Sequence, residues 1–149
     1  MMKHNLILIL AAALLLSGCK QSSGITYTPP ALEDGWSVKM TLSGGIAGLM
    51  RVIDVQSDGK YTVTDERAKD TSTGKLTDQE LSELKKLVTE MKFTAPQTDS
   101  GCADCFGYSL EIESGGRKMI AGSDDVTLGD SGMEPLVDYL RGLMDTALK

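Results

Sequence analysis

Histidine is nearly absent from this chain of 149 residues, because the only one is His4. His4 lies in the first 18 residues, which have the features of a signal peptide, so the mature protein would contain no histidine. That excludes Ser-His-Asp and Cys-His catalysis and any metal site built on imidazole. We therefore predict a protein that is not an enzyme, with no catalytic residues, no bound metal and no cofactor.

Basic clusters are also missing. The chain has 15 Lys and Arg against 21 Asp and Glu, for a net charge of −6, and loss of Lys3 with the signal would make it −7. An acidic surface without a basic patch argues against nucleic-acid binding. It also gives no electrostatic attraction to anionic lipid, so any membrane association needs another cause.

Long apolar runs are absent too: the longest, 6–16, has 11 residues, which is too short to span a bilayer. It follows Lys3 and is followed by Leu16-Ser17-Gly18-Cys19, the order expected of a lipoprotein signal peptide covering residues 1–18. We predict cleavage before Cys19, lipid on its sulfur and a further acyl chain such as palmitate on its amine. Two or more chains make membrane anchoring stable. The protein is then exported to the cell envelope, and to the outer membrane in a Gram-negative cell because Lys20 is not Asp.

Residues 19–35 are rich in Ser, Gly, Thr and Pro, which predicts a lipidated flexible tether with a reach of about 50 Å. Residues 36–149 would form one domain of the α+β class. Its elements follow the order strand-strand-strand-helix-strand-strand-helix, with an antiparallel sheet of about five strands and both helices on one face. The predicted strands lie at 36–42, 49–56, 61–64, 106–113 and 118–122, and the helices begin near 77 and 131–135, with a polar loop at 66–75 and an acidic loop at 123–130.

Two cysteines remain after Cys19 is assigned to lipid. Cys102 and Cys105 would meet an oxidising compartment, so we predict a small disulfide before the fourth strand. A redox site is an alternative, although no helix follows Cys105, and a metal site would lack further soft ligands. The acidic loop at 123–130 is a second candidate for metal, but it lacks the ligand ladder of a calcium-binding EF-hand.

The segment 43–49, Ser-Gly-Gly-Ile-Ala-Gly-Leu, interrupts two strand patterns with three glycines and a large apolar residue. It resembles the Gly-Gly-Phe-Ala-Gly-Leu type of segment in emfourin-like proteins, with Ile46 at the aromatic position. Further similarity covers 38–49, the helix at 81–93, the strand at 104–112 and Pro135-Leu136 with Leu140. The lipobox, the tether and the cysteine pair are additions to that pattern.

Emfourin-like proteins are small inhibitors of thermolysin-like metalloproteases. The resemblance implies a membrane-anchored module that binds a secreted or periplasmic metalloprotease and blocks it sterically. Close backbone approach at glycines and an apolar Ile46 suit such a contact. The alternative is an accessory or structural envelope lipoprotein that binds another protein or a surface polymer without inhibiting it. The predicted partner-binding residues are Gly44, Gly45, Ile46, Ala47 and Gly48.

Overall fold

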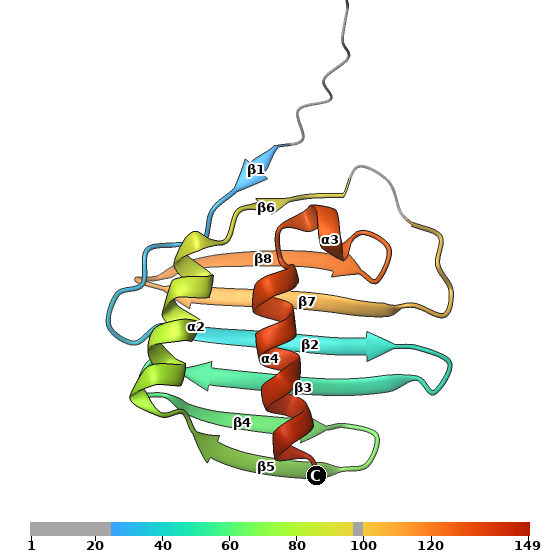
Figure 1. Cartoon of the computed structure of the whole chain (residues 1–149), viewed down its shortest axis with the longest axis horizontal. Coiled ribbons are helices and arrows are strands. Elements are labelled where there is room, and N and C mark those ends of the chain that lie inside the picture. The colour runs from blue at the N-terminus through green and yellow to red at the C-terminus, as the bar shows by residue number, and fades with distance from the viewer. Residues whose placement is uncertain (1–24, 97–99) are drawn as a thin grey trace, which may run out of the picture.

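The computed structural model describes residues 25–96 and 100–149, which form a six-stranded antiparallel sheet with helices on one face (Figure 1). In chain order the elements are β1 (Thr26–Tyr27), β2 (Ser37–Gly44), β3 (Leu49–Gln56), β4 (Lys60–Asp65), β5 (Asp70–Lys75), α2 (Asp78–Glu90), β6 (Phe93–Thr94), β7 (Phe106–Ser114), β8 (Arg117–Asp124), α3 (Leu128–Ser131) and α4 (Glu134–Ala147). The spatial order of the large sheet is β5-β4-β3-β2-β7-β8, and β1 pairs with β6 in a small separate sheet. The chain thus builds a four-stranded meander and later adds a hairpin beside β2.

The predicted α+β class, with an antiparallel sheet and its helices on one face, is confirmed. The sheet has six strands where about five were expected, because β5 occupies the segment predicted to be a polar loop at 66–75. β5 has one neighbour, β4, and its sequence Asp-Thr-Ser-Thr-Gly-Lys contains no apolar side chain to reveal an alternation. Gly74 pairs with Tyr61 and leaves room for the Tyr61 ring, which a Cβ at position 74 would overlap.

The core lies between the helices and the even-numbered faces of β2 and β7. Alternate residues of a strand point to opposite faces, so one face of each strand is apolar and the other polar. Helices α2 and α4 contribute the stripes that cover this layer. The largest fully buried side chains are Met40, Ile53, Leu84, Leu110, Ile112, Met133, Leu136, Leu140 and Met144, with Val38, Val55 and Val63.

Helix α2 begins near residue 77, as predicted, with a capping box formed by Thr77 and Glu80. The Thr77 backbone N–H donates to Glu80 Oε2 at 2.7 Å, and the Glu80 N–H donates to Thr77 Oγ1 at 3.3 Å. The bond from the Thr77 backbone holds the pKa of Glu80 below its usual value. Two N–H groups that the first turn leaves without helical partners are thereby satisfied. Helix α4 begins at Glu134 with Pro135 in its first turn, where the fixed φ of proline is tolerated.

Residues 25–35 are attached to the domain, which corrects the predicted tether of 19–35. Thr26 and Tyr27 pair with Thr94 and Phe93, and Leu32 packs against the core. The Glu33 N–H donates to the Ser114 hydroxyl at 2.7 Å. The boundary predicted at residue 36 therefore moves to about residue 25.

The predicted signal peptide at 1–18, the lipid attachment at Cys19 and the remaining tether at 20–24 lie outside the described residues. Among the helices that the structure does describe, none has the length and apolar character needed to cross a membrane.

Candidate interaction site

The turn that joins β2 to β3 depends on its glycines. Gly44, Gly45 and Gly48 have φ angles of 99°, 69° and 60°, which L side chains rarely adopt. A Cβ on Gly44 would lie 2.5 Å from the Cys105 carbonyl oxygen, and one on Gly45 would lie 2.5 Å from Cε1 of Phe106. The glycine pair thus lets the turn lie directly against the start of β7.

Backbone hydrogen bonds fix the conformation of this turn. The Gly45 N–H donates to the Cys105 carbonyl at 3.1 Å, and the Gly48 N–H donates to the Gly45 carbonyl at 2.9 Å. The half-buried Phe106 ring packs beside Gly45. The turn is thereby tied to a second segment of the chain that is distant in sequence.

Ile46 projects from this fixed turn with 92% of its surface exposed. Ala47 and Gly48 beside it are also exposed, whereas Gly44 and Gly45 are half-buried. The structure therefore brings the five predicted partner-binding residues together at one end of the sheet, on the right in Figure 1. Their arrangement is an apolar tip on a polar, hydrogen-bonded base.

Cys102 and Cys105 form a disulfide with a Cα–Cα distance of 5.5 Å, as predicted. Cys105 leads directly into β7, and its carbonyl is the acceptor for Gly45. The disulfide therefore lies next to the turn that carries Ile46. No sequence pattern indicates this proximity, since 57 positions separate Gly45 from Cys102.

Asp125 bonds to the backbone of Phe106, and the neighbouring Asp124 holds the adjacent segments. Asp125 accepts hydrogen bonds from the Phe106 N–H at 2.8 Å and from the Tyr108 hydroxyl at 2.6 Å. Asp124 accepts from the Ser100 hydroxyl and from the Thr127 N–H, and the Ser100 bond is the first cause of its lowered pKa. Both carboxylates lie in the segment predicted as an acidic loop at 123–130, which the structure divides between the end of β8, a short turn and the start of α3.

Tyr108, which donates to Asp125, is a buried polar residue near the start of β7. Burial first, and then the bond to Asp125, raises the pKa of Tyr108 to about 12, so it stays neutral at physiological pH. Arg141 of α4 lies 5.7 Å from the ring centre and donates to the Tyr108 hydroxyl at 3.4 Å. Helix α4 is thus linked to β7 close to the candidate site.

The β4–β5 turn places positive charge beside the Ile46 turn. Asp65 accepts from the backbone N–H groups of Arg67 and Ala68 at 3.1 and 2.9 Å and from Arg51 Nε at 2.9 Å. The Ala68 bond first, and then Arg51, lower the pKa of Asp65. The Arg67 guanidinium lies 3.6 Å from the point where a Cβ would sit on Gly48. Sequence reasoning missed Arg67, because the strand β5 that positions it was not recognised.

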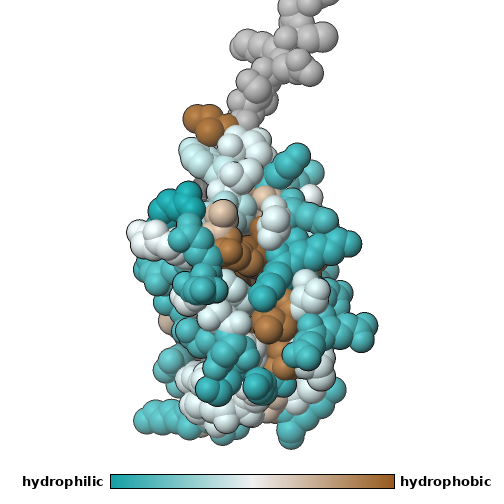
Figure 2. Space-filling model, turned by 90° about the vertical axis from the view of Figure 1, so that its left-hand side faces the viewer, coloured by the Kyte–Doolittle hydropathy of each residue, from teal (hydrophilic) through white to brown (hydrophobic). Residues whose placement is uncertain are grey.

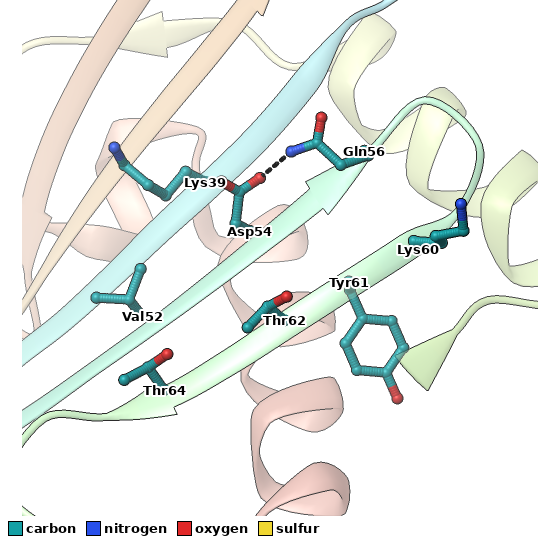
Figure 3. A pocket seen from close by; sticks show the side chains of 8 residues that line it. All are labelled: Lys39, Val52, Asp54, Gln56, Lys60, Tyr61, Thr62 and Thr64. Atoms are coloured by element: carbon teal, nitrogen blue, oxygen red, sulfur yellow. Dashed lines mark hydrogen bonds between the residues drawn. The ribbon is translucent and has the colours of Figure 1, made fainter. Parts of the chain in front are cut away.

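A second feature is a hollow of about 400 Å³ on the helix-free face of the sheet (Figure 3). Its side chains are mainly polar and come from β2, β3 and β4, with Gln56 donating to Asp54 at 2.6 Å. Such a surface suits hydrogen bonding to a polar ligand. Its lining residues are Lys39, Val52, Asp54, Gln56, Lys60, Tyr61, Thr62 and Thr64.

Metal-binding side chains are not gathered at either place. Within residues 25–96 and 100–149, no three His, Cys, Asp or Glu residues are grouped so that they could hold a metal ion. Every buried side-chain nitrogen or oxygen in this part of the chain has a hydrogen-bond partner.

The chain matched no model of a known protein family, and no curated protein matched it. The resemblance to emfourin-like proteins thus depends on the sequence segments themselves.

Proposed function

We propose that this protein is an exported lipoprotein, held on a membrane by lipid on Cys19, whose domain binds a protein partner through residues 44–48. The observation that carries the proposal is Ile46, which is 92% exposed on a turn fixed by its own hydrogen bonds. A rigid contact loses little conformational entropy on binding, so more of its contact energy is available for affinity. An exposed apolar side chain at the tip gives such a contact an anchor.

The specific partner we propose is a thermolysin-like metalloprotease, which the domain would inhibit sterically. The resemblance of residues 43–49 to the emfourin-like segment supports this choice. Ile46 would occupy an apolar subsite, and the exposed Gly48 would let the protease backbone approach closely. The backbone hydrogen bond from the turn to Cys105 would keep the turn in one conformation while it blocks the protease cleft.

Inhibition is tested by titrating the purified protein and an Ile46→Asp variant against a thermolysin-like protease. Placing a carboxylate in an apolar subsite removes the contact and adds a desolvation cost, so we expect the inhibition constant to rise at least about tenfold. Thr71→Asp is the matched control, because it adds the same charge at an exposed position on the edge strand β5. If the unmodified protein does not inhibit the protease at micromolar excess, the protease proposal is wrong.

Lipid attachment is tested separately, by the mass of the protein recovered from membranes. Loss of residues 1–18 together with added acyl mass on Cys19 is the expected result, and Cys19→Ser should abolish the added mass. A chain recovered with its N-terminus intact and no lipid would overturn this part of the proposal while leaving the inhibition test valid.

The second candidate function is an accessory or structural envelope lipoprotein that binds another protein or a surface polymer. The polar hollow on the helix-free face favours this candidate, because its hydroxyl, amide and charged groups suit a hydrated ligand. A Thr62→Val and Thr64→Val double variant would weaken that binding and leave protease inhibition unchanged. The Ile46→Asp variant would weaken protease inhibition and leave binding to the other partner unchanged.

A further inference from the structure

The exposed large apolar side chains of the described residues fall into two groups. One group lies around the Ile46 turn and the nearby ends of β3 and β8. The other lies where the described chain begins, on β1 and the edge strand β8, and Figure 2 shows apolar atoms there beside the grey trace. The first group is Ile46, Met50 and Val126; the second is Ile25, Tyr27 and Ile120, which are 70%, 47% and 63% exposed.

Tyr27 and Ile120 of the second group line a shallow groove of about 500 Å³ between the small sheet and β8, and Ile25 lies two positions before Tyr27 in the chain. The Tyr27 ring lies 6.3 Å from that of Phe93, measured between ring centres, and Met119 and Ile120 line the β8 side. Lys118 at the groove is already paired with Glu111 at 3.1 Å and with Glu113. The groove thus combines apolar side chains with Thr28 and with Lys118, whose ammonium group is paired with two carboxylates.

The distance along the chain restricts what can cover this surface. Ile25 is six positions after Cys19, so the extended segment between them spans about 20 Å at most. The sheet is wider than that, since five strand spacings from β8 to β5 add up to about 24 Å. A lipid on Cys19 would therefore keep Ile25 within about 20 Å of the bilayer, and in a domain that stands on its β8 edge the β5 edge would be about 24 Å further away.

We infer that Ile25, Tyr27 and Ile120 form a membrane-docking surface that inserts into the interfacial layer of the bilayer beside the lipid anchor. This inference rests on the proposed attachment of lipid to Cys19. Tyrosine suits the interface because its ring is apolar and its hydroxyl remains hydrated. The net negative charge of the protein means that apolar contact, rather than charge, drives the docking, which should be insensitive to salt.

Docking through Ile25, Tyr27 and Ile120 would set the orientation of the Ile46 turn relative to the membrane. The β8 edge would face the bilayer, so the strands would run roughly parallel to the membrane plane (Figure 1). The Ile46 turn extends from β2, two strands away from β8, which places it about 10 Å above the β8 edge and facing sideways. The partner that this turn binds would then be met close to the membrane surface.

The test uses the full lipidated protein in phosphatidylcholine vesicles whose acyl chains carry bromine, a quencher of tryptophan fluorescence. Tyr27→Trp puts a probe in the docking surface, and Ile46→Trp puts the same probe at the exposed turn. The native Trp36 is buried and is common to both variants. We expect brominated lipid to quench the position-27 probe well beyond the Trp36 background and to leave the position-46 probe unquenched.

A further variant identifies the side chains responsible. Ile25→Ser with Ile120→Thr in the Tyr27→Trp protein should shift the ratio of docked to undocked domain about tenfold towards undocked. Both sites are exposed, so the fold is expected to persist, which circular dichroism would check. Equal quenching at positions 27 and 46 in the lipidated protein would overturn docking alone. If the protein carries no lipid, both the docking and the proposed lipid anchor are wrong. Neither result bears on protease inhibition, which the titration tests separately.

Discussion

At the scale of single residues, Gly45 has a restricted environment in the candidate site. Its φ of 69° disfavours any side chain, and the Phe106 ring occupies the space of a Cβ. Gly45→Ala should therefore destabilise the protein by about 1–3 kcal/mol. Urea unfolding measures this change directly.

Gly142 provides the matched control, because it lies inside α4 and a methyl group added there would meet no other side chain or segment within 4 Å. Gly142→Ala should stabilise the protein by up to about 1 kcal/mol, since alanine favours the helix. Equal effects of the two substitutions would show that the Gly45 turn is not held in the conformation described.

Asp65 makes the stability of the β4–β5 corner dependent on pH. Its folded-state pKa is lowered, chiefly by the Ala68 N–H and then by Arg51, so the ionised form is the one favoured by folding. This contribution is complete above the unfolded-state pKa, near 4, and is lost as pH falls through the lowered folded-state value. Asp65→Asn should therefore reduce stability at pH 7, and the difference from the native protein should shrink at pH 3.

Urea midpoints at the two pH values test this, with Asp70→Asn as the control at an exposed carboxylate. A deficit for Asp65→Asn that stays constant between pH 7 and pH 3 would mean that ionisation of Asp65 is not its source.

At the scale of elements, the capping box should determine how well α2 begins. Thr77→Ala removes the hydroxyl that accepts from Glu80 and should cost about 1 kcal/mol. Thr89→Ala, at an exposed position inside the same helix, loses only a bond to the Lys85 carbonyl and gains helix propensity. Thermal unfolding should thus separate the two threonines, and a lower melting temperature for Thr89→Ala than for Thr77→Ala would contradict the assigned helix start.

The elements predictable from sequence are those with one apolar face. Strand β2 and helix α2 were predicted because buried residues recur at their own periods, and the turn at Asp58-Gly59 marks a hairpin. Strand β5 could not be found in this way, because it is an edge strand without apolar side chains. The attachment of residues 25–35 was missed for a related reason: two paired residues in β1 are too few to form a pattern.

The candidate site likewise has a part that the sequence predicts and a part that it does not. Glycine spacing indicated a turn at residues 44–48, because local composition encodes it, but only the structure shows that Ile46 is exposed there. Its supports could not be predicted, since the Gly45–Cys105 and Asp125–Phe106 bonds join segments that only the strand order brings together. Local sequence thus located the turn, and tertiary structure explains why that turn is rigid.

At the scale of the whole molecule, the short segment between Cys19 and Ile25 links the proposed docking to the proposed inhibition. Inserting twenty Gly and Ser residues after Gly24 would leave the domain and the Ile46 turn unchanged but would lower the effective concentration of the docking surface at the bilayer. We expect less quenching of the Tyr27→Trp probe by brominated lipid and an unchanged inhibition constant for a soluble protease.

The same insertion should weaken inhibition of a protease that is itself confined to the vesicle surface, because the turn would no longer be held at a fixed height. A twenty-residue extension after Lys149 is the control for chain length, since it leaves the distance between Cys19 and Ile25 and the contacts of residues 25–35 unaltered. If quenching persists with the long tether, the affinity of Ile25, Tyr27 and Ile120 for the bilayer is sufficient without a short connection. If inhibition of the soluble protease falls as well, the inserted segment has altered the domain itself.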